Sequence, residues 1–275
     1  MKISVIIPAY NAAQTICTAI DSVLGQSYAE TDIVIVNDGS SDNIEEVISK
    51  YESRVKLVSI PNGGVANARN VGLAYAEGDF VMFLDADDRL KPDCFENIIK
   101  EQQLTNADVV RFGYELDYGD GELKKPLNFF KKRELILKHE FPEKIYPYYI
   151  NGIMLNSVCM TLFRKELLDN ISFRVDMKTA EDAIFSMQAY TRAEKVLIIP
   201  DAYYVYNQTG GSLTGSGLAL IEKYKCNIRV SKEIIHLLPQ WRMNSPLWQI
   251  RAAMRPVVLT FDKLRRMGAS GGGEA

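Results

Sequence analysis

The stretch FVMFLDADD (Phe80–Asp88) decides the fold prediction for this chain. Its five leading apolar residues predict a strand buried on both faces, as in a parallel sheet covered by helices. Three carboxylates follow at the carboxyl end of that strand, where ligands bind in open α/β sheets. Asp85 and Asp87 are two residues apart, so an extended backbone directs both side chains the same way. Such a pair suits Mg²⁺ or Mn²⁺, and the alternative is an acidic turn that caps the next helix.

Alternating strands and helices precede this stretch. The expected elements are, in order, Ile3–Ile7, Ala13–Leu24, Asp32–Val36, a helix with Ile44, Val47, Ile48 and Tyr51 on one face, Val55–Ile60 and Val65–Ala76. Pro8 is expected to end the first strand because proline lacks the ladder donor. Three strand–helix units followed by a buried strand predict an α/β fold with a doubly wound, mainly parallel sheet and right-handed crossovers.

The second half of the chain is less regular. The expected elements are a helix starting near Pro92, a strand over Ala107–Leu116, a helix near Lys131–Glu140, a strand over Asn156–Phe163, a short helix over Arg164–Leu168, a helix opened by Lys178–Asp182 with Ile184, Phe185, Met187 and Tyr190 facing inward, two strands over Val196–Ile199 and Ala202–Tyr206, and a flexible Gly/Ser loop over 210–217. Pro200 and Asp201 are expected to separate the two strands.

Two helices close the chain. The first is expected over Leu220–Leu238, and the second carries an apolar stripe made of Leu247, Ile250, Met254, Val257, Val258, Phe261 and Leu264. The other side of this second helix is basic through Arg251, Arg255, Lys263, Arg265 and Arg266, and Pro256 is expected to kink it. We expect the stripe to pack on the core and the basic side to face solvent. The alternative is that this helix contacts a membrane surface.

The composition of the chain argues against several classes of protein. The 275 residues are 47% hydrophobic and 24% charged with a formal net charge of −3, which is ordinary for a globular protein and gives no sign of nucleic-acid binding. The cysteines and histidines are isolated in the sequence, so neither a zinc site nor a disulfide framework is expected. No apolar run approaches the ~20 residues that span a bilayer. We expect a cytoplasmic protein, with peripheral contact at the inner face of the cell membrane as the alternative.

Four loops are expected to meet at the carboxyl edge of the sheet: Pro8–Asn11, Asn37–Asp42, the segment before Val65, and Asp85–Asp88. Such an edge suits a nucleotide, because Tyr10 can stack on a base and Asp38 can accept the imide proton of uracil. Arg69 can pair with a phosphate or reach the base. The alternatives are that Asp38 caps the following helix and that Arg69 forms a surface ion pair. Neither a dinucleotide-binding glycine motif nor a P-loop occurs, so a metal on Asp85 and Asp87 is expected to hold any diphosphate.

The chain resembles the family-2 glycosyltransferases, inverting nucleotide-sugar transferases of GT-A fold. The matching segments, spread over residues 1–215, are VIIPAYN (Val5–Asn11), VIVNDGS (Val34–Ser40), NGGVANARNVG (Asn62–Gly72), FLDADD (Phe83–Asp88) and ED (Glu181–Asp182). The ordered combination is specific, although each piece alone is weak. One departure is Asn37, where the family often has the first aspartate of a pair; asparagine still accepts a hydrogen bond.

The resemblance implies a set of site residues. The implied nucleotide-binding residues are Pro8, Tyr10, Asn11, Asp38, Asn67, Arg69, Asp85 and Ala86, and the implied ligands of Mn²⁺ or Mg²⁺ are Asp87 and Asp85. Inversion requires an acceptor hydroxyl to attack the anomeric carbon while a carboxylate takes its proton. Asp182 is predicted to be this base, with Glu181 orienting the acceptor or the helix start. The alternative is that both merely favour a helix N-terminus electrostatically.

The resemblance implies transfer of a hexose or N-acetylhexosamine from a UDP-sugar to a hydroxyl of a saccharide or lipid-linked saccharide acceptor, in bacterial surface-polysaccharide synthesis. Residues 1–215 are expected to form the GT-A domain, with a nucleotide-binding half (1–100) and an acceptor-side half (101–215), followed by a helical C-terminal extension (216–269) and a disordered tail (270–275). The alternative hypotheses are that the chain is a non-catalytic nucleotide-sugar-binding protein or a sugar nucleotidyltransferase. The latter is disfavoured because Pro8–Asn11 lacks a Gly-rich basic loop. The 210–217 loop is expected either to close over bound donor or to serve as a linker.

Overall fold

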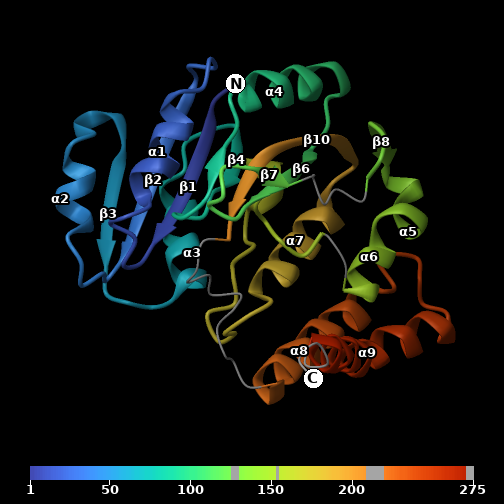
Figure 1. Ribbon diagram of the computed structural model, residues 1–275. Helices are drawn as coiled ribbons and strands as arrows, with labels where there is room; N and C mark the ends of the chain where they lie inside the picture. The colour runs from blue at the N-terminus through green and yellow to red at the C-terminus, as the bar shows by residue number, and fades with distance from the viewer. Residues whose placement is uncertain (125–129, 153–154, 209–219, 271–275) are drawn as a thin grey trace.

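The computed structural model describes residues 1–124, 130–152, 155–208 and 220–270, and Figure 1 shows how its elements are arranged. The elements of the first part are β1 (Ile3–Ala9), α1 (Ile16–Leu24), β2 (Thr31–Asp38), α2 (Ile44–Ser49), a 3-10 turn (Glu52–Arg54), β3 (Lys56–Ile60), α3 (Val65–Tyr75), β4 (Phe80–Phe83), β5 (Arg89–Leu90) and α4 (Cys94–Thr105). This succession is the strand–helix alternation that the sequence predicts.

The elements of the second part are β6 (Val109–Asp117), β7 (Leu123–Lys124), β8 (Glu134–Leu137), a 3-10 turn (Lys138–Glu140), α5 (Phe141–Lys144), α6 (Tyr146–Asn151), β9 (Thr161–Arg164), a 3-10 turn (Lys165–Leu168), α7 (Glu181–Arg192), β10 (Lys195–Asn207), α8 (Leu220–Leu237) and α9 (Pro246–Ser270). The predicted Gly/Ser loop over 210–217 lies outside the described residues, as does nearly all of the predicted disordered tail. In the part of the chain that the structure describes, no helix is both long and apolar enough to cross a membrane.

One mixed sheet runs through the molecule in the order β3-β2-β1-β4-β9-β6-β10-β5, with β7 added to β6 and β8 to β10. β3, β2, β1 and β4 are mutually parallel, with Ile3 of β1 opposite Thr31 of β2 and Phe80 of β4. β9 then runs antiparallel to both β4 and β6. The predicted doubly wound, mainly parallel sheet is confirmed in this first half. The carboxyl ends of its parallel strands therefore share one edge.

The core is built around the stretch that begins at Phe80. All four residues of β4 are buried, as the unbroken apolar run predicts for a strand covered on both faces. α3 packs closely on β1 because Gly72 has no side chain. A Cβ added at Gly72 would lie 2.3 Å from Cγ2 of Ile6. This close approach fixes α3, and with it Asn67 and Arg69, against the sheet.

Two strand boundaries differ from the sequence predictions, in both cases at a proline. Pro8 lies inside β1 and is paired with Val36 of β2, so the prediction that it ends the strand is wrong. β4 pairs with β1 only as far as Ile6, whose carbonyl accepts the Leu84 N–H. Pro8, two residues further on, points to the same side but has no strand opposite it, so its missing N–H costs no ladder bond.

The second proline does not break a strand either. β10 is continuous from Lys195 to Asn207, where two strands separated by Pro200 are predicted from the sequence. Its pairing with β6 shifts register between Ile198 and Ala202, so an irregularity in the ladder accommodates the proline.

The helix predicted near Lys131–Glu140 is wrong. Glu134–Leu137 is the strand β8, antiparallel to the start of β10, and only Lys138–Glu140 is helical, as a 3-10 turn. Ile136 is buried in this pairing. This pairing depends on backbone hydrogen bonds that the edge of β10 offers, which the local sequence of residues 131–140 does not reveal. β9 is also shorter than predicted. Cys159 before it makes only an isolated bridge to Phe83.

The packing of α9 is the reverse of the prediction. Ala252, Arg255 and Pro256 face the protein, whereas the stripe residues up to Phe261 are exposed to solvent. Arg255 is only 3% exposed; it donates to the Tyr149 carbonyl at 3.0 Å and to Oδ1 of Asn227 at 2.8 Å. α9 lies beside α8 and α6, and Figure 1 shows the two C-terminal helices packed side by side.

Candidate active site

The loops after β1 and β2 are tied together at the carboxyl edge of the sheet. Oδ1 of Asn11 accepts the Ser41 N–H at 2.8 Å, and the Asn11 N–H donates to Oγ of Ser40 at 2.9 Å. Asp42 closes the same junction by accepting the Ala13 N–H at 2.8 Å. Tyr10 stands beside this junction with 55% of its surface exposed, so its ring is open to a planar ligand. Pro8 contributes a buried strand position instead.

Asp38, the last residue of β2, organises the loop before α3. Its two carboxylate oxygens accept the N–H groups of Gly63 and Gly64, each at 2.8 Å. Gly64 has a positive φ of 84°, a backbone conformation that strongly favours glycine. The alternative that Asp38 caps α2 is wrong, because Asn43 occupies that cap position. Asn67 lies in the first turns of α3 with its side chain against Gly63.

The hydrogen bonds of Asn37 explain why an asparagine suits this position. Its Nδ2 donates to Oε1 of Glu45 at 2.9 Å, and its Oδ1 accepts the Ser40 N–H at 3.0 Å. Ser59 donates to the same Glu45 oxygen at 2.5 Å, and together Ser59 and Asn37 lower the pKa of Glu45. An aspartate at position 37 would place a second carboxylate against Glu45. The amide therefore belongs to a local network with Glu45.

Arg69 joins carboxylates from distant parts of the chain. Nη2 lies 2.9 Å from Oδ1 of Asp85, while Nη1 lies 2.5 Å from Oδ1 of Asp182 and 3.2 Å from Oε1 of Glu181. The guanidinium also lies over the Phe173 ring, 5.5 Å from its centroid. Arg69 is only 5% exposed, so the alternative of a surface ion pair is wrong. We call Arg69, Asp85, Glu181 and Asp182 the arginine cluster.

The arginine cluster carries more negative than positive charge. Burial raises the pKa of Asp182 to about 7 against the lowering effect of Arg69, and Glu181 and Asp85 raise it further. For Arg69 itself burial opposes the charge, but Asp182 and Asp85 outweigh burial and raise its pKa. Glu181 and Asp182 are also the first two residues of α7, where carboxylates favour the positive end of the helix dipole. The first turn of α7 is therefore part of the arginine cluster.

Asp87 is the carboxylate best suited to a metal ion. Oδ1 of Asp85 is bound by Arg69, and its Oδ2 accepts from the Cys159 thiol at 3.5 Å. Asp87 has no ion pair among the described residues, and burial together with the Asp85 charge raises its pKa. A hard divalent cation would relieve that uncompensated charge. No group of three or more His, Cys, Asp or Glu side chains converges as a metal site in the described ranges.

The acidic turn is also held by hydrogen bonds between Asp88 and β10, which the sequence analysis did not predict. Asp88 is 1% exposed; its Oδ2 accepts from the Tyr204 hydroxyl at 2.5 Å and its Oδ1 from the Asn207 N–H at 2.8 Å. Burial and the Asp85 charge raise the pKa of Asp88 to about 8. The Tyr204 hydroxyl also accepts the Asp85 N–H at 3.4 Å. β10 therefore braces the acidic turn from over 100 residues away, and no local signal marks Tyr204 for this role. Ala86, 8% exposed, is packed inside the turn.

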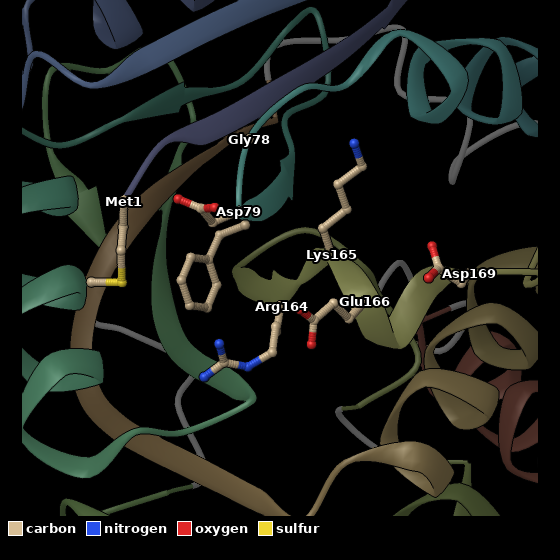
Figure 2. A pocket seen from close by; sticks show the side chains of 8 residues that line it. Met1, Gly78, Asp79, Arg164, Lys165, Glu166 and Asp169 are labelled. Carbon is tan, nitrogen blue, oxygen red and sulfur yellow. The ribbon is translucent and has the colours of Figure 1, made fainter.

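A separate cavity of about 480 Å³ lies at the opposite edge of the sheet, lined by Met1, Gly78, Asp79, Phe80, Arg164, Lys165, Glu166 and Asp169 (Figure 2). Three of its charged side chains are already engaged by other groups. Asp79 accepts the Lys2 N–H at 2.8 Å, Arg164 pairs with Asp108 at 3.1 Å, and Lys165 donates to the Ala76 carbonyl. It also lies at the amino ends of β1 and β4. We therefore take the carboxyl edge of the sheet, and not this cavity, as the candidate functional site.

The chain is similar to known glycosyltransferases. The sequence profile of glycosyl transferase family 2 matches residues 4–172. The chain is similar to EpsJ of Bacillus subtilis, an uncharacterized glycosyltransferase, with 30% identity over 217 residues, 77% of this chain and 62% of EpsJ. It is also similar to the poly(ribitol-phosphate) beta-N-acetylglucosaminyltransferase TarS of Staphylococcus aureus, with 27% identity over 86% of this chain and 41% of TarS. The chain thus spans less than two thirds of either relative.

Solved structures extend the comparison. S. aureus TarS 1-349 in complex with UDP-GlcNAc has a TM-score of 0.73 at 27% identity, covering 86% of this chain and 67% of that one. The mannosyltransferase PcManGT of Pyrobaculum calidifontis, in complex with GDP-Man and Mn²⁺, shares the fold alone, with a TM-score of 0.58 at 17% identity. The resemblance predicted from the sequence is confirmed. Because the family profile covers more than half of the chain, the chain belongs to glycosyl transferase family 2 and has the GT-A fold.

Proposed function

We propose that this protein is an inverting, metal-dependent glycosyltransferase that moves a hexose or N-acetylhexosamine from a UDP-sugar to a hydroxyl of a saccharide or lipid-linked saccharide. One observation carries the proposal. Arg69 brings the acidic turn after β4 and the carboxylates that begin α7 into one cluster. A donor-side and an acceptor-side carboxylate are thereby held at a single edge of the sheet.

The donor would lie across the loops after β1, β2 and β4. The exposed ring of Tyr10 is available to stack on the base. Asp38 shapes the neighbouring wall through Gly63 and Gly64, and the remaining lone pairs of its two oxygens are what a uracil imide would use. Asn11 is hydrogen-bonded to the loop after β2, and the Asn67 side chain lies against Gly63. The complex of TarS with UDP-GlcNAc supports a UDP-sugar donor.

Mn²⁺ or Mg²⁺ would be held by Asp87, with Asp85 beside it, and would neutralise the charge of the leaving diphosphate. The Mn²⁺ complex of PcManGT supports this at the level of the fold only. Arg69 keeps one Asp85 oxygen engaged and so limits how far that side chain can turn. The protein's contribution on this side is a rigid, negatively charged turn, braced from behind by Asp88 and Tyr204.

The acceptor side rests on Asp182. The acceptor oxygen forms a bond to the anomeric carbon from the face opposite the nucleotide, the bond from that carbon to the diphosphate oxygen breaks, and the hydroxyl proton passes to a carboxylate oxygen of Asp182. A base with a pKa of about 7 is well matched to a reaction near neutral pH. Glu181, held on the same Arg69 nitrogen, would keep the start of α7 in place or orient the acceptor.

The names of two relatives support a class of acceptor. TarS is named a poly(ribitol-phosphate) beta-N-acetylglucosaminyltransferase, and the minor teichoic acid biosynthesis protein GgaB of B. subtilis is 30% identical over 89% of this chain and 27% of GgaB. We therefore propose a cell-surface polymer or its lipid-linked precursor as acceptor. We further propose that residues 1–215 form the catalytic unit and that α8 and α9 extend it.

The test is hydrolysis of a panel of UDP-sugars by the purified protein with Mn²⁺ or Mg²⁺, and again with chelator. We expect slow release of UDP from one sugar nucleotide, abolished by chelator. Calorimetry with plain UDP separates the other outcomes. UDP binding without hydrolysis or transfer on any surface-polymer acceptor would favour the non-catalytic binding reading, and the absence of any UDP binding would contradict the proposal.

A further inference from the structure

The outer face of α9 is an exposed apolar stripe. Leu247, Ile250, Met254, Val257, Val258 and Phe261 are each between 46% and 68% exposed. Their spacing of three and four residues places them on one side of the helix. We call these six residues the α9 stripe. A soluble protein rarely presents so many large apolar side chains in one row unless they contact something.

The fold holds this face outward. On the opposite side of α9 Ala252 is fully buried, and Leu259 lies against Gly152 of the turn after α6. Arg255 is bound to the Tyr149 carbonyl and to Asn227 of α8. Turning the helix to bury the stripe would break these two hydrogen bonds of a buried guanidinium and expose Ala252. The outward stripe is therefore a feature of the packed structure.

The C-terminal segment that contains the stripe is rich in basic residues. Residues 220–270 contain ten Lys and Arg but three Asp and Glu, whereas the whole chain has a net charge of −3. Arg251 flanks the α9 stripe, with its guanidinium 5.0 Å from the centroid of the Trp248 ring. This excess of basic residues in the sequence of the segment favours a partner surface that is anionic. A second copy of this chain docked stripe to stripe would instead bring two positive regions together.

We propose that the α9 stripe docks on an anionic lipid surface, with its apolar side chains at the boundary between headgroups and acyl chains. An anionic phospholipid surface has an apolar layer that complements the stripe and a negative charge that complements the basic residues. Helices with an apolar face, basic residues and aromatic side chains bind membranes in this way. The proposal does not depend on which sugar nucleotide the active site uses. If the acceptor is lipid-linked, such docking would bring the catalytic unit to it.

The test is flotation of the full chain with vesicles of phosphatidylcholine alone or of phosphatidylcholine with roughly one quarter phosphatidylglycerol. We expect binding to the anionic vesicles that weakens, without vanishing, as salt is raised. The double variant Ile250→Gln/Phe261→Gln should lower the apparent lipid affinity roughly tenfold or more. Leu104→Gln/Val175→Gln is the matched control, because both residues are at least 60% exposed but lie far from the stripe in sequence.

Three outcomes would overturn the proposal. One is equal binding by the protein and its stripe variant, and another is equal binding to neutral and anionic vesicles. The third is a concentration-dependent dimer, seen by light scattering, that the stripe variant loses, which would assign the stripe to a second copy. Circular dichroism spectra and melting curves that match between the stripe variant and the matched control confirm that any lost binding comes from the stripe and not from unfolding.

Discussion

Arg69 sets one positive charge against the carboxylates of Asp85, Glu181 and Asp182 in a largely buried setting. One guanidinium cannot balance three carboxylates, so the arginine cluster keeps an excess of negative charge. That excess adds to the effect of burial in raising the pKa of Asp182 to about 7. It also adds to the field that favours a cation at Asp87. The proposed base and the proposed metal ligand are therefore electrostatically linked through Arg69.

Replacing Asp182 tests the base directly. Asn has nearly the same shape but cannot take the acceptor proton, so Asp182→Asn should lower kcat by about 10²- to 10⁴-fold. UDP affinity should change little, because Asp85 keeps its own bond to Arg69. Steady-state transfer rates and calorimetry with UDP measure the two effects. Glu181→Gln is the matched control and should lose less. Turnover by Asp182→Asn at the rate of the unaltered protein would contradict the assignment.

The pH dependence tests Arg69 as a positioning residue. A base must be ionised to act, so kcat/KM should rise as pH passes through about 7, the pKa of Asp182 in the free protein. Arg69 lowers that pKa, so Arg69→Gln should move the rise in kcat/KM to higher pH, whereas Arg69→Lys retains a charge and should move it less. The measurement is kcat/KM against pH for the three proteins. A uniformly lower rate with an unmoved midpoint would mean that Arg69 serves only stability.

At the scale of elements, the seat of α3 on β1 depends on a missing side chain. Gly72→Ala would place a Cβ 2.3 Å from Cγ2 of Ile6. Overpacking of this kind costs about 1–3 kcal/mol, more than the ~1 kcal/mol gained from helix propensity. We therefore expect a lower free energy of unfolding in urea. Ile6→Ala removes the clashing group, so the double variant should be more stable than the sum of the single effects predicts. Strict additivity would refute this contact.

The sequence predicts secondary structure correctly where local residues determine it. It fails where pairing with a strand distant in the sequence determines the conformation. The helices and strands up to β4 follow from apolar periodicity and from turns. Glu134–Leu137 and the region of Pro200 do not, because their conformations depend on pairing with β10 and β6. The site divides in the same way. Asp85 and Asp87 are visible in one motif, whereas the bond from Arg69 to Asp182 spans 113 residues and has no local signal.

The α9 stripe shows a limit of periodicity itself. The spacing of Leu247, Ile250 and Met254 correctly indicates an amphipathic helix but does not say which side meets the core. Arg255 decides this by reaching the Tyr149 carbonyl and Asn227. A buried arginine among small side chains on one face, opposite a row of large apolar ones, is a pattern that only the packed structure interprets.

At the scale of the whole molecule, the sheet combines two unlike halves. The parallel half, β3 to β4, supplies loops at one edge, and β9, β6 and β10 continue the sheet behind the acidic turn. Tyr204 on β10 reaches Asp88, while α7 brings Asp182 to Arg69. The candidate site is therefore completed only when both halves are assembled. Ligand binding at this site should stabilise the assembled molecule as one unit.

The thermal stability of the whole chain tests that linkage together with the metal. A ligand at about 100 times its Kd adds about 2.7 kcal/mol to the free energy of unfolding, which for a chain of this size raises Tm by roughly 5–10 °C. UDP with Mn²⁺ should therefore raise Tm well beyond UDP alone or Mn²⁺ alone, because the diphosphate and Asp87 would share the ion. Differential scanning fluorimetry measures the shift. Asp87→Asn should lose the increment due to Mn²⁺ and keep that due to UDP. An identical rise with chelator present would show that the carboxylates after β4 hold no metal.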